Sequence, residues 1–356
     1  MAELDREPEE IARLRRQLLE WYELKRRDLP WRRTRDPYAI WVSEIMLQQT
    51  RVSVVVERYQ AFMERFPTLV SLALAPEQAV LALWSGMGYY GRARNLHKAA
   101  QFVAEGHRGN LPSTAEELRA LPGIGVYTAA AIASIAHGER VAVVDGNVER
   151  VLCRMAGWEA DNRGAALKRK IEELAAQMVD PEQPGDYNQA LMELGATVCL
   201  PRNPQCPACP FSAGCMTRGE HKAPKRPRML SREVAHALSV RIGLQPGEAN
   251  RQVLLEQRPA SQSVMPGLWE LPVLRDTAVP DNELRMTVRH SIMQVNYYVR
   301  IRTVFEDDAA TQTFPGGERR WVPLGEAAGM ALTGLTRKVL KRAHLLPAAS
   351  LDAIAP

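Results

Sequence analysis

Four of the five cysteines fall in one short, proline-rich stretch with the spacing C-x6-C-x2-C-x5-C. They are Cys199, Cys206, Cys209 and Cys215. A compact loop of this kind brings four thiolates together, which is typical of a metal site. Structural zinc sites usually pair two C-x2-C knuckles, whereas this run has one, so one 4Fe-4S cluster is the favoured interpretation and zinc is the alternative. The remaining Cys153 follows a helical pattern and is expected to be a small buried residue.

The chain divides into two regions of different periodicity. From Pro8 to about Thr197 apolar residues recur at helical spacing, and prolines interrupt the pattern, which predicts many short helices. Later segments have strand-like composition, and apolar and polar residues alternate over 295–304, which predicts one buried and one polar face. We therefore predict a helical region over 1–217, a basic, proline-rich linker over 218–232 and an α+β domain over 233–356.

The charge balance and the lack of long apolar runs narrow the class of protein. There are 46 basic against 41 acidic residues, a net charge of +5 that mildly favours a polyanionic partner. No run approaches the roughly 20 apolar residues that a membrane span needs. The acidic N-terminus lacks the layout of a secretory signal peptide. A cytoplasmic protein without a membrane partner is the expectation.

A glycine-containing turn, Leu-Pro-Gly-Ile-Gly at 121–125, precedes an alanine-rich helix predicted over 126–136. Gly123 and Gly125 permit a tight turn, and its amides at a helix N-terminus can hold a phosphate without reading base sequence. The pattern indicates a helix-hairpin-helix. A simple helix connector has similar composition and is the alternative.

Two carboxylates stand in environments that suit acid–base chemistry. Glu44 has apolar neighbours, and burial there would raise its pKa and leave it able to donate a proton. Asp145 follows the apolar run 141–144 and begins Asp-Gly-Asn-Val. An exposed helix glutamate and a capping aspartate are the alternatives for these two residues.

Several motifs occur together in one order along the chain. They are WVSEIMLQQTR at 41–51, GMGYYG at 86–91, LPGIGVYT at 121–128, VDGNV at 144–148 and the cysteine run. In this combination the chain resembles the MutY-type adenine DNA glycosylases, over most of residues 29–215. The resemblance implies a helix-hairpin-helix fold with an iron-sulfur loop. It also implies a monomeric repair enzyme that removes adenine mispaired with 8-oxoguanine or guanine from duplex DNA and leaves an abasic site.

The resemblance assigns roles to four residues. Cleavage of an N-glycosidic bond needs a proton for the leaving base and stabilisation of the cationic sugar, as in glycoside hydrolysis. By resemblance Glu44 protonates adenine at N7, and Asp145 stabilises the oxocarbenium-like sugar or adds to it transiently. Tyr127 and Asn147 are implied to orient these groups and the deoxyribose.

Further residues are implied to contact DNA, because the base must leave the stack before it can be cleaved. Gln49 and Tyr89 are the implied wedges, with a solvated glutamine and a half-buried tyrosine as the alternatives. The others implied to line the adenine pocket or contact DNA are Trp31, Arg32, Thr50, Gln189, Gly123, Gly125 and Ser291.

Three related functions are weighed against this one. An endonuclease III-like lyase uses a lysine as an imine-forming nucleophile, but Val126 and Tyr127 occupy that stretch and no lysine lies between Lys98 and Lys168. A thymine-mismatch glycosylase shares much of the scaffold, and the Leu-Gln-Gln-Thr stretch favours adenine. A DNA-binding homologue without catalysis is disfavoured by the presence of Glu44 with Asp145.

The C-terminal region carries a motif of its own, Met-Pro-Gly-Leu-Trp-Glu-Leu-Pro at 265–272. It resembles the Nudix-like domain with which MutY proteins inspect 8-oxoguanine. Residues 273–290 lack an Arg-Glu-x-x-Glu-Glu pattern, so we expect recognition and no phosphohydrolase activity. Ile292-Met293-Gln294 replaces the Phe-Ser-His frequent in the family. Either Ser291 or Gln294 supplies the lesion contact, or the preference for 8-oxoguanine is weaker.

Overall fold

A computed structural model of the chain describes residues 7–106, 109–158, 164–221, 228–243, 251–292, 294–304, 311–312 and 317–347. The chain forms two compact units, one from Met1–Ala73 with Lys98–Lys225 and one from Leu74–His97 with Arg226–Pro356. The domain boundaries at 217 and 233 remain a prediction. The contacts add Leu74–His97, from within the helical sequence region, to the C-terminal unit. None of the helices in the described ranges is long and apolar enough to cross a membrane.

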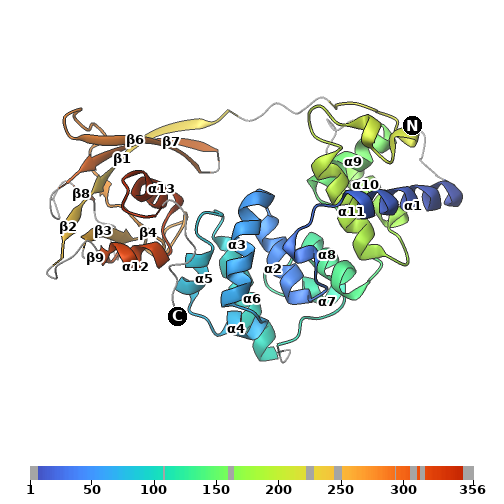
Figure 1. Cartoon of the computed structure of the whole chain (residues 1–356), viewed down its shortest axis with the longest axis horizontal. Helices are drawn as coiled ribbons and strands as arrows, with labels where there is room; N and C mark the ends of the chain where they lie inside the picture. The colour runs from blue at the N-terminus through green and yellow to red at the C-terminus, as the bar shows by residue number, and fades with distance from the viewer. Residues whose placement is uncertain are drawn as a thin grey trace. The chain divides into compact units, whose positions relative to one another are not determined.

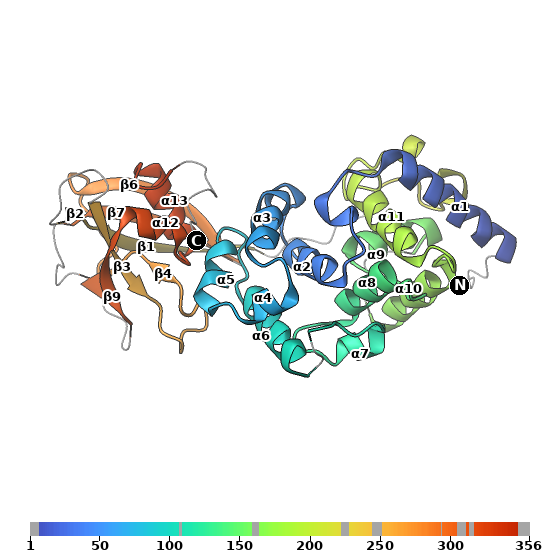
Figure 2. The ribbon, with the colours of Figure 1, turned by 60° about the horizontal axis from the view of Figure 1, so that its bottom comes forward.

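The first unit is helical, as the periodicity predicts (Figure 1). Its elements are α1 (Pro8–Lys25), η1 (Pro30–Arg32), α2 (Pro37–Leu47), α3 (Val52–Arg65), α4 (Leu69–Ala73), α7 (Ala115–Arg119), α8 (Val126–His137), α9 (Gly146–Ala156), α10 (Ala165–Met178), α11 (Pro184–Thr197), η2 (Cys206–Ala208) and η3 (Ser212–Gly214). Helix α6 (Gly91–Gly106) begins in the second unit and ends in the first. Helices α8, α9 and α11 lie side by side, as Figures 1 and 2 show.

Local sequence explains where helix α2 begins and why it is buried. Pro37 occupies the first turn, where its missing N–H costs nothing, and the Asp36 side chain accepts a hydrogen bond of 3.0 Å from the Tyr38 amide. The helix is buried from Tyr38 to Met46 and packs against the alanine-rich α8. Small alanine side chains allow close approach, and this packing brings Glu44 of α2 to Tyr127 of α8.

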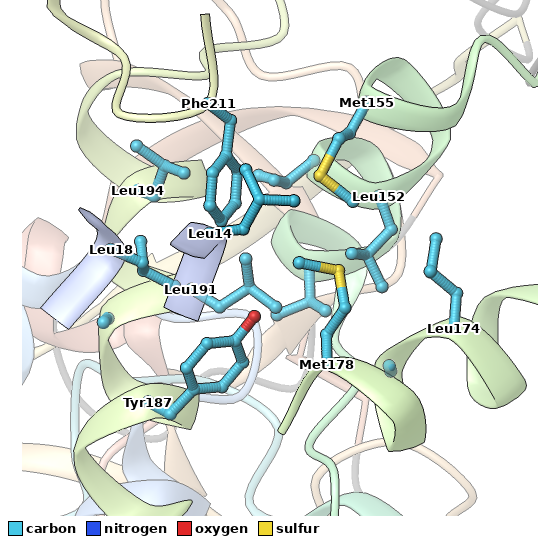
Figure 3. Close-up of a cluster of buried hydrophobic side chains, with 14 of the residues drawn as sticks. Leu14, Leu18, Leu152, Met155, Leu174, Met178, Tyr187, Leu191, Leu194 and Phe211 are labelled. Atoms are coloured by element: carbon cyan, nitrogen blue, oxygen red, sulfur yellow. The ribbon is translucent and has the colours of Figure 1, made fainter. Parts of the chain in front are cut away.

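One hydrophobic core joins α1, α9, α10 and α11 (Figure 3). Leu14, Leu18 and Tyr22 recur every four residues on α1 and are all buried there. Figure 3 shows Phe211, from the cysteine loop, reaching into the same core beside Leu14. Burial of this aromatic ring, which is 2% exposed, anchors the cysteine loop on the helices.

The second unit is α+β. Its elements besides the start of α6 are α5 (Glu77–Leu83), β1 (Leu230–Leu238), β2 (Val240–Ile242), β3 (Arg251–Gln257), β4 (Trp269–Glu270), β5 (Val273–Leu274), β6 (Leu284–Ile292), β7 (Val295–Thr303), β8 (Thr311–Gln312), β9 (Arg319–Pro323), α12 (Leu324–Gly329) and α13 (Gly334–Arg342). One sheet has the order β6-β7-β1-β5-β8, with β1 parallel to β7 and β6 antiparallel to β7. The other has β3 paired with β2, β4 and β9. Apolar residues of both sheets share a core with α12 and α13.

Strand β7 departs from the predicted alternation at one residue. Val299 and Ile301 are fully buried as predicted, but Asn296 is also buried on the face predicted to be polar. Its side-chain oxygen accepts a hydrogen bond of 2.7 Å from Ser291 in the paired strand β6. A buried polar group needs such a partner, and the sequence pattern alone does not show it.

Candidate active site

A cavity of about 820 Å³ in the first unit brings most of the predicted residues together. The predicted residues among those lining it are Trp31, Arg32, Glu44, Gln49, Thr50, Gly123, Gly125, Tyr127, Asp145, Asn147 and Gln189. They come from η1, α2 and the turn after it, the hairpin turn, α8, α9 with its N-cap, and α11. Residues distant in sequence therefore converge on one concave site, which is the usual form of an active site.

Glu44 is a buried carboxyl group that can hold a proton at neutral pH. Its residue is 5% exposed, and the Tyr127 hydroxyl donates a hydrogen bond of 2.7 Å to its Oε2. The pKa of Glu44 is raised to about 7: burial is the largest cause, Tyr127 opposes it, Asp145 adds to it and Arg32 also lowers it. The alternative of an exposed helix glutamate is wrong.

Asp145 is both a helix cap and part of the cavity wall. Its Oδ1 accepts hydrogen bonds from the amides of Asn147, at 2.9 Å, and Val148, at 2.7 Å. Its Oδ2 accepts a bond of 2.8 Å from the Asn147 side chain. The capping interpretation is confirmed, and it coexists with a place beside Glu44 in the cavity. These bonds fix the orientation of the carboxylate.

Arg150 in turn fixes Asn147. Its guanidinium donates bonds of 2.8 Å to Asn147 Oδ1 and 2.7 Å to the Gly195 carbonyl, and its Nε donates one of 2.7 Å to the Cys199 carbonyl. Gly195 lets α11 approach α9 closely, because an added Cβ would lie 2.6 Å from Asn147 Cβ. The cysteine loop and Asp145 are thus linked through two side chains.

A third carboxyl group in the cavity, Glu193, is held in its ionised form. It is 1% exposed and accepts bonds of 2.7 and 2.6 Å from the Arg27 guanidinium and 2.9 Å from Arg32. Burial alone would raise the pKa of Glu193. The hydrogen bonds from the two arginines outweigh burial and lower this pKa to about 2. The cavity therefore combines Glu44, which can hold a proton at neutral pH, with Glu193, which stays ionised, and with Asp145.

Sequence analysis missed Arg27 and Glu193, both of which line the cavity. The available signal was the position of Glu193 four residues after Gln189, which places both on one helix face. Arg32, predicted for the adenine pocket, also lies over the Tyr22 ring, with 5.4 Å from its guanidinium carbon to the ring centroid. Trp31 is 6% exposed and packs edge-to-face on Tyr59, so it is part of the core as well as the cavity.

The two predicted wedge residues share a strained backbone conformation. Gln49 has φ 56° and Tyr89 has φ 47°, in the left-handed region that side chains other than glycine rarely adopt. Gln49 is exposed and lines the cavity of the first unit. Tyr89 and Ser291 belong to the second unit. Met293 lies outside the described residues.

The hairpin turn offers free space for a ligand at the start of α8. Gly123 has φ 75°, as its turn requires, and the Ile124 amide closes the turn on the Leu121 carbonyl at 3.2 Å. Gly125 precedes α8 and has no side chain to cap it. Both glycines are exposed, so solvent or a ligand can reach the start of α8, where phosphate binding at a helix N-terminus occurs.

The four clustered cysteines line one small cavity together. Arg154, 3% exposed, holds the loop: its Nη1 lies 3.4 Å from Cys199 Sγ, and its carbonyl accepts from Cys215 Sγ at 3.4 Å. Burial, and then the neighbouring cysteines, raise the pKa of the Cys209 thiol to about 11. Among the described residues no group of histidine, cysteine or acidic side chains is arranged to hold a single metal ion. Four converging thiols with an adjacent guanidinium fit a cluster in which each iron takes one thiolate.

Comparison with known proteins decides the family. Residues 42–177 match the family described as HhH-GPD superfamily base excision DNA repair protein. The adenine DNA glycosylase of Mus musculus is 36% identical over 403 residues, covering 93% of this chain and 78% of the mouse protein. This chain belongs to the adenine DNA glycosylase family.

A second relative and two solved structures are also similar to this chain. The adenine DNA glycosylase of Homo sapiens is 41% identical over 321 residues, covering 76% of this chain. The chain spans only 59% of the human protein's length in that alignment. A solved thermostable thymine-DNA glycosylase is 30% identical with a TM-score of 0.54, covering 59% of this chain and 97% of that one. An endonuclease III structure, 22% identical with a TM-score of 0.51, shows the same fold.

Proposed function

We propose that this chain is a monofunctional adenine DNA glycosylase that removes adenine mispaired with 8-oxoguanine or guanine from duplex DNA. The observation that carries the proposal is the pairing of two different carboxyl groups in one cavity. Glu44 has a pKa of about 7 and a hydrogen bond from Tyr127, while Asp145 accepts three hydrogen bonds in the same cavity. Two carboxyls kept in different environments are the arrangement that glycosidic cleavage needs.

The proposed reaction follows from these environments. Glu44 donates its proton to adenine N7, the C1′–N9 bond breaks and its electron pair leaves with the base. Asp145 stabilises the cationic sugar. Water then adds to C1′ and releases a proton, which leaves an abasic site. Arg27, Arg32 and Glu193 form a charged, ordered wall of the same cavity and are proposed to bind the polar edge of the extruded base.

Hydrolysis without an imine step is supported by the cavity lining. Lysine is absent from the described residues that line it, and an imine-forming lyase needs an amine nucleophile there. Tyr127, in the stretch where a lyase carries that lysine, has its hydroxyl engaged with Glu44. The product is therefore proposed to be an intact strand with an abasic site.

Adenine is favoured over thymine by the extent of the similarity. The solved thymine-DNA glycosylase covers 59% of this chain, whereas the mouse adenine DNA glycosylase covers 93% and therefore reaches the C-terminal unit. A shared catalytic scaffold does not by itself choose the base. The thymine-directed function is the second candidate, and the choice of substrate tests it.

The C-terminal unit is proposed to be a Nudix-like domain that recognises the base opposite adenine. The hairpin of β6 and β7 carries the residues in question. The Ser291 hydroxyl already donates to Asn296, so it is left as an acceptor. The side chain of Gln294 is exposed and can both donate and accept. Gln294 is therefore the better candidate for the lesion contact.

One 4Fe-4S cluster is proposed on Cys199, Cys206, Cys209 and Cys215. When bound, it crosslinks the loop and performs no step of the hydrolysis. Phe211 anchors the loop in the helical core, and Arg154 donates to the carbonyls of Leu200 and Pro201 at 2.7 and 3.0 Å. These residues keep the cysteine loop ordered. Separately, the amides of the hairpin turn at 121–125 are proposed to bind the DNA backbone in sequence-independent contacts.

The test is adenine release in single turnovers from duplexes with adenine opposite 8-oxoguanine, guanine or thymine. The expected order is fastest opposite 8-oxoguanine, with loss of release in Glu44→Gln and Asp145→Asn. Glu57→Gln, an exposed glutamate on α3, is the matched control. Release of thymine from a mismatch, or no release from any duplex, would overturn the proposal.

A further inference from the structure

The segment Leu74–His97 carries the exposed Tyr89 and is fastened to the C-terminal elements of its own unit. The loop of residues 84–90, between α5 and α6, is called the Tyr89 loop. We propose that Arg337 and Ser85 are positioning residues that hold the Tyr89 loop in a fixed place relative to the β6–β7 hairpin. In this way insertion of Tyr89 into the duplex and inspection of the opposite base become one event. This inference rests on the proposed function and adds the specificity device to it.

The attachment centres on the main-chain carbonyl of Leu332, which is fully buried. It accepts hydrogen bonds from two hydroxyls of the segment, at 3.0 Å from Tyr90 and 3.3 Å from Ser85. The Arg337 Nε donates a bond of 2.8 Å to Ser85 Oγ, and its Nη2 donates one of 3.2 Å to the Met330 carbonyl. Buried, shared hydrogen bonds of this kind define one geometry, because an unmade bond there would leave a polar group without water.

A second attachment reaches the motif at 265–272. Gln78 donates a bond of 3.3 Å to the Gly267 carbonyl, and Arg94 bonds the Pro266 carbonyl while pairing with Glu77 at 3.0 Å. One group of contacts therefore holds the middle of the segment, and the other holds residues near both of its ends. With both groups of contacts made, the segment Leu74–His97 cannot rotate freely relative to the C-terminal elements of its unit.

Helix α13 connects these contacts to the lesion-reading hairpin. Arg337 faces the Tyr89 loop, and the next residue, Lys338, donates a bond of 2.8 Å to the Arg289 carbonyl of β6. At the start of the helix, an added Cβ on Gly334 would lie 3.4 Å from the His290 ring. The helix thus contacts strand β6 within two residues of Ser291 and the Tyr89 loop through Arg337.

Tyr89 is presented in a way that suits stacking between bases. Its side chain is 50% exposed although its neighbour Tyr90 is 4% exposed. The Arg92 guanidinium lies over both the Tyr89 and Trp84 rings, with 5.6 and 5.4 Å from its carbon to the ring centroids. An exposed aromatic ring supported from one side and held by a backbone with φ 47° has few other conformations. Such a ring inserts into a base stack at little entropic cost.

The consequence is that the preference for 8-oxoguanine over guanine depends on a fixed distance between the Tyr89 loop and the β6–β7 hairpin. If the loop and the hairpin are one body, contact with 8-oxoguanine favours the position in which Tyr89 enters the stack. With plain guanine that contact is missing, so the rigid link gives little advantage. Loosening the link should therefore slow excision opposite 8-oxoguanine more than excision opposite guanine.

The test compares the full-length variants Arg337→Ala, Ser85→Ala and Tyr90→Phe with Arg342→Ala, an exposed residue on the same helix. The first measurement is the ratio of single-turnover adenine release opposite 8-oxoguanine to that opposite guanine. The second is equilibrium binding of duplexes carrying a tetrahydrofuran abasic analogue opposite either base, which needs no catalysis. We expect both ratios to fall about tenfold in Arg337→Ala, from loss of the charged hydrogen bonds to Ser85 and to the Met330 carbonyl, and to stay unchanged in Arg342→Ala.

Ser85→Ala and Tyr90→Phe remove only hydroxyl groups and should lower the ratios in the same direction while the melting temperature changes little. Ratios equal to wild type in folded Ser85→Ala and Tyr90→Phe would overturn the inference, as would an equal fall in Arg342→Ala. The binding ratio separates the two proposals. If the wild-type protein releases no adenine, the proposed function fails, while a lost binding preference in these variants would still support the link.

Discussion

The Tyr127 hydroxyl donates a 2.7 Å hydrogen bond to Glu44 Oε2 across the α2–α8 contact. Burial keeps Tyr127 a neutral phenol by raising its pKa well above the ordinary value, so its hydroxyl proton is available for this bond. This bond favours the ionised form of Glu44 and opposes the effect of burial on its pKa. The pKa of Glu44 is thus set by two opposing effects, burial and the hydrogen bond from Tyr127.

Removal of that hydroxyl should shift the pH dependence of catalysis. In Tyr127→Phe the bond that lowers the pKa of Glu44 is lost, so the carboxyl keeps its proton to higher pH. We expect the alkaline decline in adenine release to move upward and the maximal rate to fall, because Glu44 loses its orienting partner. Rate profiles of adenine release against pH for the two proteins measure this, and a downward shift would contradict it.

The same burial should make the protein less stable at alkaline pH. The pKa of Glu44 rises from 4.5 to about 7 on folding, so between these values the folded state binds more protons than the unfolded state. Stability is then fully present below the lower value and falls as pH rises through the higher one, by roughly 3 kcal/mol for this group. Glu44→Gln lacks this loss. Urea unfolding at acidic and alkaline pH should show the variant gaining stability over wild type only at alkaline pH, and an equal gain at both would argue against burial as the cause.

Close approach of α11 to α9 makes Gly195 sensitive to substitution. A Cβ there would lie 2.6 Å from Asn147 Cβ and 2.9 Å from its carbonyl oxygen. Gly195→Ala should therefore cost about 1–3 kcal/mol of stability and slow adenine release, because Asn147 holds Asp145. Gly106→Ala, where an added Cβ meets nothing within 4 Å, is the control for denaturant midpoints and rates. Equal behaviour of the two variants would count against this contact.

The cysteine loop should contain iron. Purified protein is expected to be brown with absorbance near roughly 400 nm, and Cys209→Ser should lose both the colour and thermal stability. Cys153→Ser, at a buried position on α9 outside the C-x6-C-x2-C-x5-C run, should keep the iron. Metal analysis measures this directly, and a colourless protein that holds zinc would contradict it.

How far the sequence predicts the site depends on how local each interaction is. Glu44, Tyr127 and Asp145 stand in short motifs whose order carries the family resemblance, and the cavity brings them together. The ion pairs of Glu193 with Arg27 and Arg32 join residues from α11 to the start of the chain, and no local pattern indicates which charges meet. Burial raises the pKa of Glu44, whereas hydrogen bonds from the two arginines lower the pKa of Glu193. This difference follows only from the burial and geometry of the folded protein.

For the fold, too, local sequence patterns predict the elements but not every contact between them. Helical and alternating periodicities predict the change from helices to sheets, because each pattern reflects one buried face. The burial of Asn296 depends on a cross-strand bond from Ser291. The membership of Leu74–His97 in the second unit depends on bonds to Leu332. Neither contact leaves a periodic signal in the sequence.

The most direct test of the central claim is the pH dependence of single-turnover adenine release by the wild-type protein, with adenine opposite 8-oxoguanine. Glu44 must be protonated to act, and its pKa is about 7. The account predicts a constant rate below this value and a decline of about tenfold for each pH unit well above it, with Glu44→Gln inactive throughout. A rate that is unchanged across neutral pH, or a Glu44→Gln variant that still releases adenine at the wild-type rate, would contradict the account.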